Sequence, residues 1–113
     1  MQQNSQNPML QQQMQDCIQD CLNCAQVCRD KANSIQGQNT DQVNLLLDCA
    51  ELCMTAAHFM QHSSPVYGYV CQACAQVCTH LEDVSAQAGM DDIANACKNC
   101  AYSCQHMVKM VAF

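Results

Sequence analysis

The apolar positions of the chain recur every three or four residues in four successive stretches, and cysteine is a regular member of each repeat. In the first stretch, Cys17, Cys21, Cys24 and Cys28 follow one another at spacings of four, three and four residues. A helix turns by about 100° per residue, so this spacing places the four sulfurs within an arc of roughly 60°. The pattern predicts a helix whose core-facing positions, where leucine is usual, carry thiols instead.

The other three stretches repeat this motif. They contain Cys49 and Cys53, then Cys71, Cys74 and Cys78, and finally Cys97, Cys100 and Cys104. The segments are built mainly on Gln, Ala, Met, Leu, Asp and Asn, and aromatic or β-branched residues do not alternate as they do in strands. We therefore expect helices and no sheet.

Glycine, proline and capping residues mark where these helices begin and end. Gly37 and Gly89 stand where the first and third helices would close, and the second is expected to stop around Ser63. Proline is favoured at the first helical position, a small polar residue at the cap before it, and negative charge in the first turn. The starting signals are Asn7-Pro8, Thr40-Asp41, Ser64-Pro65 and Asp91-Asp92.

The resulting prediction is an all-α fold: an up-down-up-down antiparallel four-helix bundle with a cysteine-lined core. We expect the helices at about residues 8–36, 40–63, 65–88 and 91–111. Residues 1–7 are then a disordered N-terminal tail, and residues 8–113 form the bundle. A single domain suits a chain of 113 residues.

Charge and hydropathy exclude some classes of partner. Four Lys and Arg against ten Asp and Glu give a formal net charge of −6, which repels nucleic-acid phosphates but suits a metal cation. No uninterrupted apolar stretch approaches the roughly 18 residues that cross a bilayer. The glutamine- and asparagine-rich start has neither the basic patch nor the apolar run of an export signal. We expect a cytoplasmic protein with no nucleic-acid or membrane partner.

Twelve cysteines are typical of either a disulfide scaffold or a set of metal sites. Cysteine used merely as a small apolar core residue would be scattered among Leu and Ile. Helical neighbours have Cβ atoms about 5–6 Å apart, whereas a disulfide needs about 3.5–4.5 Å. Disulfides between helices are geometrically possible, but a reducing cytosol opposes them. A metal ion with metal–sulfur bonds of about 2.3 Å bridges the gap without strain, so we favour metal binding.

The choice of metal follows from softness and geometry. Thiolates suit copper(I), zinc and iron–sulfur clusters. Structural zinc sites favour closed sets of four ligands, usually presented by turns, and no glycine-rich knuckle surrounds these cysteines. Residues 17–28 read C-x3-C-x2-C-x3-C with no following proline, which differs from the bacterial ferredoxin run. Copper(I) needs only two sulfurs, and each sulfur can bridge two ions, so the set could hold on the order of a dozen.

Storage of multiple copper(I) ions is therefore the leading hypothesis, and a zinc or iron–sulfur binding protein is the alternative. A thiol redox enzyme is less favoured, because such chemistry usually places a C-x2-C pair at a helix N-terminus beside a βαβ unit, and here every pair lies in mid-helix. The sequence also lacks a nucleophile–base set for hydrolysis. We predict no enzymatic activity.

The repeated C-x3-C-x2-C-x3-C and C-x2-C-x3-C patterns resemble the bacterial four-helix-bundle copper storage proteins over nearly the whole chain, from about residue 10. The resemblance implies that the core binds many copper(I) ions through cysteine pairs, and it assigns this role to all twelve cysteines. It also implies the cytosolic type and a homo-oligomer, commonly a tetramer. Ile18, Leu22, Leu47 and Met54, expected on outward faces, would suit such an assembly. The copper donor and acceptor are left open.

Soft thioether side chains gather at one end of the predicted bundle. Met14, Met60 and Met107 continue or flank the cysteine stripes there, so we predict them as weak, exchangeable copper(I) ligands at an entrance. The alternative is that they merely fill the end of the core. Three histidines at the same end, expected to lie on the surface roughly opposite the cysteine faces, are His58, His62 and His106.

Overall fold

A computed structural model describes residues 8–110 and consists there of helices and short connections, with no strand in that range. The helices are α1 (Pro8–Ser34), α2 (Thr40–Gln61), α3 (Tyr67–Gln87) and α4 (Asp91–Met110). They form an elongated body with principal extents of 54 × 20 × 20 Å. The predicted all-α four-helix fold is confirmed.

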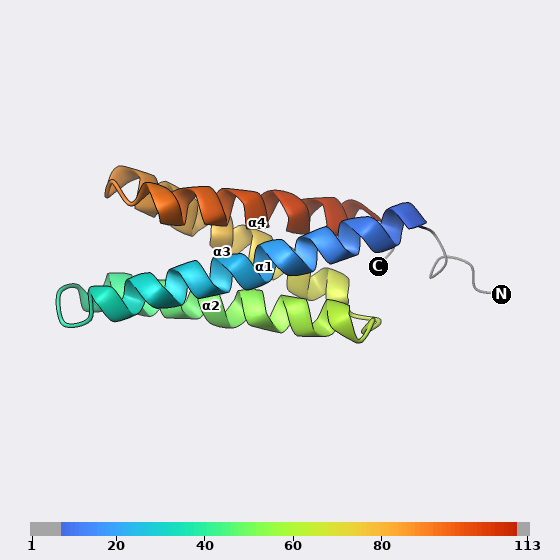
Figure 1. Cartoon of the computed structure of the whole chain (residues 1–113), viewed down its shortest axis with the longest axis horizontal. Helices are drawn as coiled ribbons and strands as arrows, with labels where there is room; N and C mark the ends of the chain where they lie inside the picture. Colours follow the sequence, from blue (N-terminus) through green and yellow to red (C-terminus); the bar gives the residue numbers. More distant parts are fainter. Residues whose placement is uncertain (1–7, 111–113) are drawn as a thin grey trace.

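The four helices run alternately up and down (Figure 1). The beginning of α1, the α2–α3 turn and the end of α4 lie together at the right of that view, and the other two connections lie at the left. Each helix packs against two neighbours, α1 against α2 and α4, and α3 against the same two. The side chains that face the shared axis therefore come from all four helices.

Small side chains dominate the packed interior. All twelve cysteines have 0% of their surface exposed, and alanines such as Ala25, Ala50 and Ala56 are buried beside them. Larger apolar residues are fully buried mainly toward the two ends: Leu46, Leu81 and Ile93 at one, Met60 and Met107 at the other. The middle of the bundle is thus lined by thiols and the two ends by larger side chains. Burial of this apolar surface stabilises the packing of the helices by roughly 25 cal/mol per Å².

Helix α2 begins at Thr40 as predicted but with a different cap, and the predicted start of α3 is displaced. Asn39, not Thr40, caps α2, because its side-chain oxygen accepts a hydrogen bond from the Gln42 backbone N–H at 3.0 Å. Helix α3 begins at Tyr67 rather than at residue 65, since the Ser64 hydroxyl accepts from the Val66 N–H at 3.2 Å and holds Pro65 in a turn. The predicted cap Asn7 and the tail of residues 1–7 lie outside the described residues.

The helix ends fall slightly earlier than predicted. Gly37 and Gly89 have φ of 89° and 75°, in the left-handed region that glycine adopts most readily, so α1 and α3 end shortly before them. Helix α2 ends at Gln61 rather than at residue 63, because Ser63 itself is left-handed at φ 53°. The Ser64 N–H then reaches back to the Phe59 carbonyl at 2.9 Å. Helix α4 is described to Met110, and the predicted residue 111 lies beyond.

The residues predicted to face outward differ in how far they are exposed. Ile18, predicted to face outward, is only 4% exposed, and Leu22 and Met54 are half-buried. The prediction was wrong for Ile18 because the buried face of α1 is wider than the cysteine stripe alone.

Helix α2 is long and apolar enough to cross a membrane by length and composition, but core helices of bundles meet the same criterion. The absence of a membrane segment therefore stays a prediction.

Candidate metal centre

The sulfurs of neighbouring helices meet along the axis of the bundle. At mid-length, the Cys100 sulfur lies 3.6 Å from that of Cys21, 3.8 Å from that of Cys53 and 3.9 Å from that of Cys74. These four cysteines come from four different helices. The heptad spacing of each stripe thus brings together thiols that lie up to 87 residues apart in the chain, as Cys17 and Cys104 do.

The thiols form five overlapping groups in which all ligand atoms lie within 4.8 Å of one another. From one end of the bundle to the other they are Cys17/Cys71/Cys104, Cys21/Cys74/Cys100/Cys104, Cys53/Cys74/Cys78/Cys100, Cys24/Cys49/Cys53/Cys78 and Cys24/Cys28/Cys49/Cys97. Every cysteine of the chain belongs to at least one group, and each group shares a sulfur with the next. We call this continuous arrangement the sulfur column.

The spacing of the sulfurs suits shared metal ions. With metal–sulfur bonds of about 2.3 Å, two sulfurs on one ion are about 3.8 Å apart in a tetrahedral site, about 4.0 Å in a trigonal one and about 4.6 Å in a linear one. Contacts along the column run from 3.6 Å for Cys100–Cys21 to 4.0 Å for Cys49–Cys53. Three- or four-coordinate ions would therefore fit with little helix movement, and two-coordinate ions would require a shift of under about 1 Å.

All twelve cysteines are free thiols in this structure. A disulfide would bring two sulfurs to about 2.05 Å, well inside any contact in the column. The disulfide framework that the sequence left open is therefore not formed.

The thiols resist ionisation as a set. The pKa of Cys100 lies far above its ordinary value, because the neighbouring thiols, Cys104 first, and then burial oppose its charged form. The pKa of Cys28 is raised in the same way, with Cys24 as the largest cause. Hydrogen bonding from Cys100 foremost lowers the pKa of Cys24. A thiolate is thus tolerated among protonated neighbours, but ionising the whole column requires a compensating cation.

Aliphatic side chains seal the column beyond the Cys24/Cys28/Cys49/Cys97 group. Leu46, Leu81 and Ile93 are between 0 and 1% exposed and continue the cysteine stripes of α2, α3 and α4. Ser85 is fully buried near them, and its hydroxyl has no hydrogen-bond partner. We call this the closed end. Its fully buried residues offer no soft ligand. It could be recognised from sequence because these residues occupy stripe positions just beyond the cysteines, Leu46 and Ile93 before the first cysteine of their helices and Leu81 after the last.

Methionines lie beyond the opposite group, Cys17/Cys71/Cys104, at what we call the open end. Met60 and Met107 are 1% and 0% exposed, and Met14 is half-buried against the core. The structure thus brings all three to the end of the column where the sequence placed them. Met110, three residues after Met107, is 37% exposed and does not share this burial.

The open-end group has three sulfurs because α2 contributes none. Where the other helices carry Cys17, Cys71 and Cys104, α2 has Ala56 and Ala57, both 0% exposed. The sequence showed that α2 has only two cysteines but not which group would lack a ligand, because that depends on how the four helices are aligned. The group at the open end therefore has the fewest sulfurs of the five.

The histidines lie outside the sulfur column. His58 and His62 are exposed on α2 and the turn after it, and His62 contacts Phe59 with ring centroids 5.8 Å apart. His106 is half-buried on α4 and meets Tyr102 edge-on at 4.7 Å. None of the three belongs to a described group of potential metal ligands.

Fold and site together define a helical bundle whose interior is a continuous column of thiols, a protein that takes up several soft metal ions. The profile of a family described as copper storage protein matches residues 2–109, so the chain belongs to the copper storage protein family. No curated protein matches the chain significantly. Among solved structures, the Nmul_A1745 protein from Nitrosospira multiformis is similar, with a TM-score of 0.82, 30% identity, and coverage of 89% of this chain and 99% of that one.

Proposed function

We propose that the sulfur column stores copper as copper(I), with about one ion for each of the twelve cysteines. Copper storage is the role of the family, and the buried cysteine groups are the site that supports it. The proposal adds the oxidation state and the number of ions. It is carried by one observation: the five sulfur groups overlap, so neighbouring ions can share thiolates along the whole column.

Charge balance in the core favours a monovalent ion at this ratio. Among the described residues, the only buried polar side chains are Ser64 and Ser85, so the interior holds no cation to balance thiolates. A buried charge without a partner is costly. One copper(I) for each thiolate leaves the column neutral, and each thiol that binds releases one proton. Copper(I) also suits thiolate ligands by its softness.

Zinc fits the same column less well. A tetrahedral zinc ion with four thiolates carries a net charge of −2, which nothing in the interior balances. At most two of the four-sulfur groups share no sulfur, for example Cys21/Cys74/Cys100/Cys104 and Cys24/Cys28/Cys49/Cys97. Without bridging, zinc would thus occupy about two sites and use only part of the column. The geometry therefore favours copper(I) over the zinc alternative.

The methionines at the open end complete the proposal as an entrance. Met14, Met60 and Met107 offer thioethers next to the three-sulfur group, whereas the side chains that continue the stripes at the closed end, Leu46, Leu81 and Ile93, are aliphatic. Thioether sulfur is a soft, uncharged ligand, so copper(I) can bind it without proton release and then pass to a thiolate.

We also propose that the protein works as a homo-oligomer, a tetramer by its resemblance to the family, in a reducing compartment such as the cytoplasm. Exposed apolar side chains such as Leu47 at 41% and Tyr102 at 64% support an assembly. Twelve closely spaced free thiols support a reducing compartment, because an oxidising one would favour disulfides.

An anaerobic titration tests the stored ion and its number. Copper(I) is added to the reduced protein in competition with a chromophoric copper(I) chelator, and released protons are counted in unbuffered solution. We expect about twelve ions withheld per chain and about one proton released for each. A parallel titration with zinc should saturate near two ions. Fewer than about four copper ions would indicate discrete structural sites and contradict storage in the column.

A further inference from the structure

We propose that the cleft between the start of α1 and the end of α2, which contains both Met14 and Met60, is where a copper(I) complex of a small thiol peptide docks before it hands copper to the sulfur column. The inference rests on the proposed function, since it names the chemical class that supplies the stored ion.

The cleft lies at the open end and has a volume of about 650 Å³. It is lined by Pro8, Gln11, Gln12, Met14, Gln15, Ile18, Gln19, Met60, Gln61 and Ser63. Two of the three open-end thioethers therefore border one hollow on the side of the bundle. Met60 is almost fully buried and Met14 is half-buried.

A residue that lines the cleft is adjacent in sequence to the first thiol of α1. Ile18, which lines the cleft, directly follows Cys17, whose sulfur lies 3.7 Å from that of Cys104. On the α2 side, the buried residues between Cys53 and Met60 include Ala56 and Ala57, the smallest side chains available to a helix without glycine. An ion held by the two thioethers would thus have the three-sulfur group as its nearest buried thiols.

The lining suits a peptide rather than a bare ion or a folded acidic protein. Half of the residues around the cleft are glutamines, and none carries a formal charge. Each glutamine amide can both donate and accept hydrogen bonds, which is what peptide groups require. A volume of this size lies within the range of about 300–1,000 Å³ that is usual for small-molecule sites.

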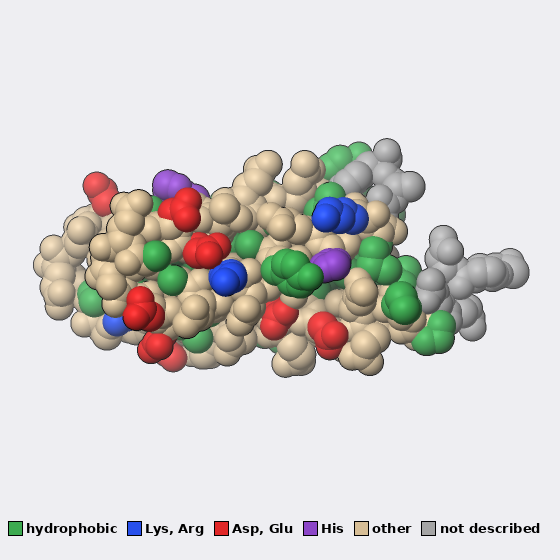
Figure 2. Space-filling model, turned by 90° about the horizontal axis from the view of Figure 1, so that it is seen from above, with side chains coloured by type: hydrophobic (Ala, Val, Ile, Leu, Met, Phe, Trp, Pro, Cys, Tyr) green, Lys and Arg blue, Asp and Glu red, His purple; other side chains and the backbone are tan. Residues whose placement is uncertain are grey.

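The charge distribution directs an anionic complex to this end. The mid-plane of the bundle passes through the contacting thiols of Cys21, Cys53, Cys74 and Cys100. The open half holds two acidic side chains and one basic one, a net charge of −1. The closed half holds eight acidic and three basic ones, a net charge of −5, and the two halves account for the formal −6. In Figure 2, acidic side chains spread over the left and centre of the visible face but not over its right-hand end.

Small thiol peptides carry carboxylates, so their copper(I) complexes are anionic and meet the least repulsion at the open half. The transfer involves no change in oxidation state. The copper–sulfur bond to the peptide breaks, a copper–sulfur bond to the protein forms, and the proton lost by the protein thiol goes to the released peptide thiolate. Charge and atoms balance with the peptide thiol as the product.

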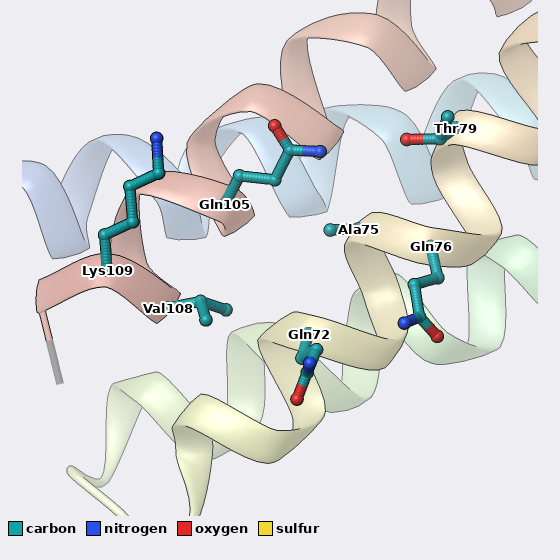
Figure 3. Close-up of a pocket in the computed structure, with 7 residues that line it drawn as sticks. All are labelled: Gln72, Ala75, Gln76, Thr79, Gln105, Val108 and Lys109. Carbon is teal, nitrogen blue, oxygen red and sulfur yellow. The ribbon is translucent and has the colours of Figure 1, made fainter. Parts of the chain in front are cut away.

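A second groove provides a matched control on the other side of the bundle. It lies between α3 and α4, has a volume of about 510 Å³ and is also bordered by glutamines (Figure 3). Gln72 and Gln76 stand four residues apart on α3 there, as Gln15 and Gln19 do on α1 in the cleft. All four are exposed, but no methionine or cysteine lines the second groove.

The experiment measures copper loading rates of the full chain by anaerobic stopped flow from two donors, the anionic copper(I)–glutathione complex and the cationic copper(I)–acetonitrile complex. We expect the double variant Gln15→Glu/Gln19→Glu to load about three- to tenfold more slowly from the glutathione complex but no more slowly from the acetonitrile complex. The double variant Gln15→Lys/Gln19→Lys should load faster than the wild type from the glutathione complex. Gln72→Glu/Gln76→Glu should load at the wild-type rate, and all variants should reach the wild-type copper content.

Three results would overturn the proposal. They are unchanged loading rates in the cleft variants, equal slowing in the α3 control, and a sedimentation coefficient of the cleft variants that differs from the wild type, which would show that a second copy of the chain covers the cleft. A failure of the proposed function looks different, because the wild-type chain would then withhold few copper ions whatever the loading rate.

Discussion

The two ends of the bundle continue the same four stripes with different chemistry. At the open end the stripes run on into Met60 and Met107, and at the closed end into Leu46, Leu81 and Ile93. Methionine and leucine are similar in size and both fill a core, but only methionine offers a soft lone pair. Under the proposed function this difference gives the column a direction, with copper exchange at the open end and a purely structural role for the closed end.

The largest effect should come from emptying the closed end. Leu81→Ala removes a fully buried side chain, so the free energy of unfolding of the copper-free protein should fall by about 2–5 kcal/mol, measured by denaturant titration. The loading rate of the folded variant should equal that of the wild type, because the closed end takes no part in exchange. Faster loading in Leu81→Ala would show that copper can also pass this end, and the contrast between the ends would fail.

The open end should respond in the opposite way. Replacing Met14, Met60 and Met107 together by Leu keeps the volume, so the cost in unfolding free energy should stay within about 1.5 kcal/mol per site. Loss of the soft ligands should slow copper loading by about tenfold and leave the final copper content unchanged. Met90→Leu is the control, since Met90 is half-buried beside the closed end. Equal loading rates in the triple variant and the control would remove the entrance.

The sequence predicted the fold and the identity of the column, but not its internal arrangement. Spacing within each helix is local, so the stripe from Cys17 to Cys28 could be read directly, and so could Gly37 and Gly89 as helix ends. Which thiols meet across helices depends on the alignment of four helices. For that reason the contact of Cys21 with Cys100 and the missing α2 ligand beside Cys17 appear only in three dimensions.

Errors at the surface and at the helix starts have a similar origin. The prediction that Ile18 faces outward assumes that the buried face of the helix is centred on the cysteines. Packing against a neighbouring helix buries a wider arc of α1, and Ile18 lies within it. Asn39 and Thr40 are both good capping residues, and only the backbone conformation decided that Asn39 caps α2. The sequence predicts that Met14 and Met60 lie at one end, but it does not predict the cleft that they share, because the glutamines around it look like ordinary surface residues.

The smallest predicted effect concerns Ser85, which marks the closed end as structural. Its hydroxyl is fully buried and has no hydrogen-bond partner, a defect that costs about 1–3 kcal/mol. Ser85→Ala should therefore raise the free energy of unfolding of the copper-free protein by about 1 kcal/mol, measured by denaturant titration. Copper content and loading rate should not change, since the hydroxyl is a hard oxygen that copper(I) does not favour. A loss of bound copper in Ser85→Ala would instead place Ser85 among the ligands, and the closed end would no longer be a purely structural plug.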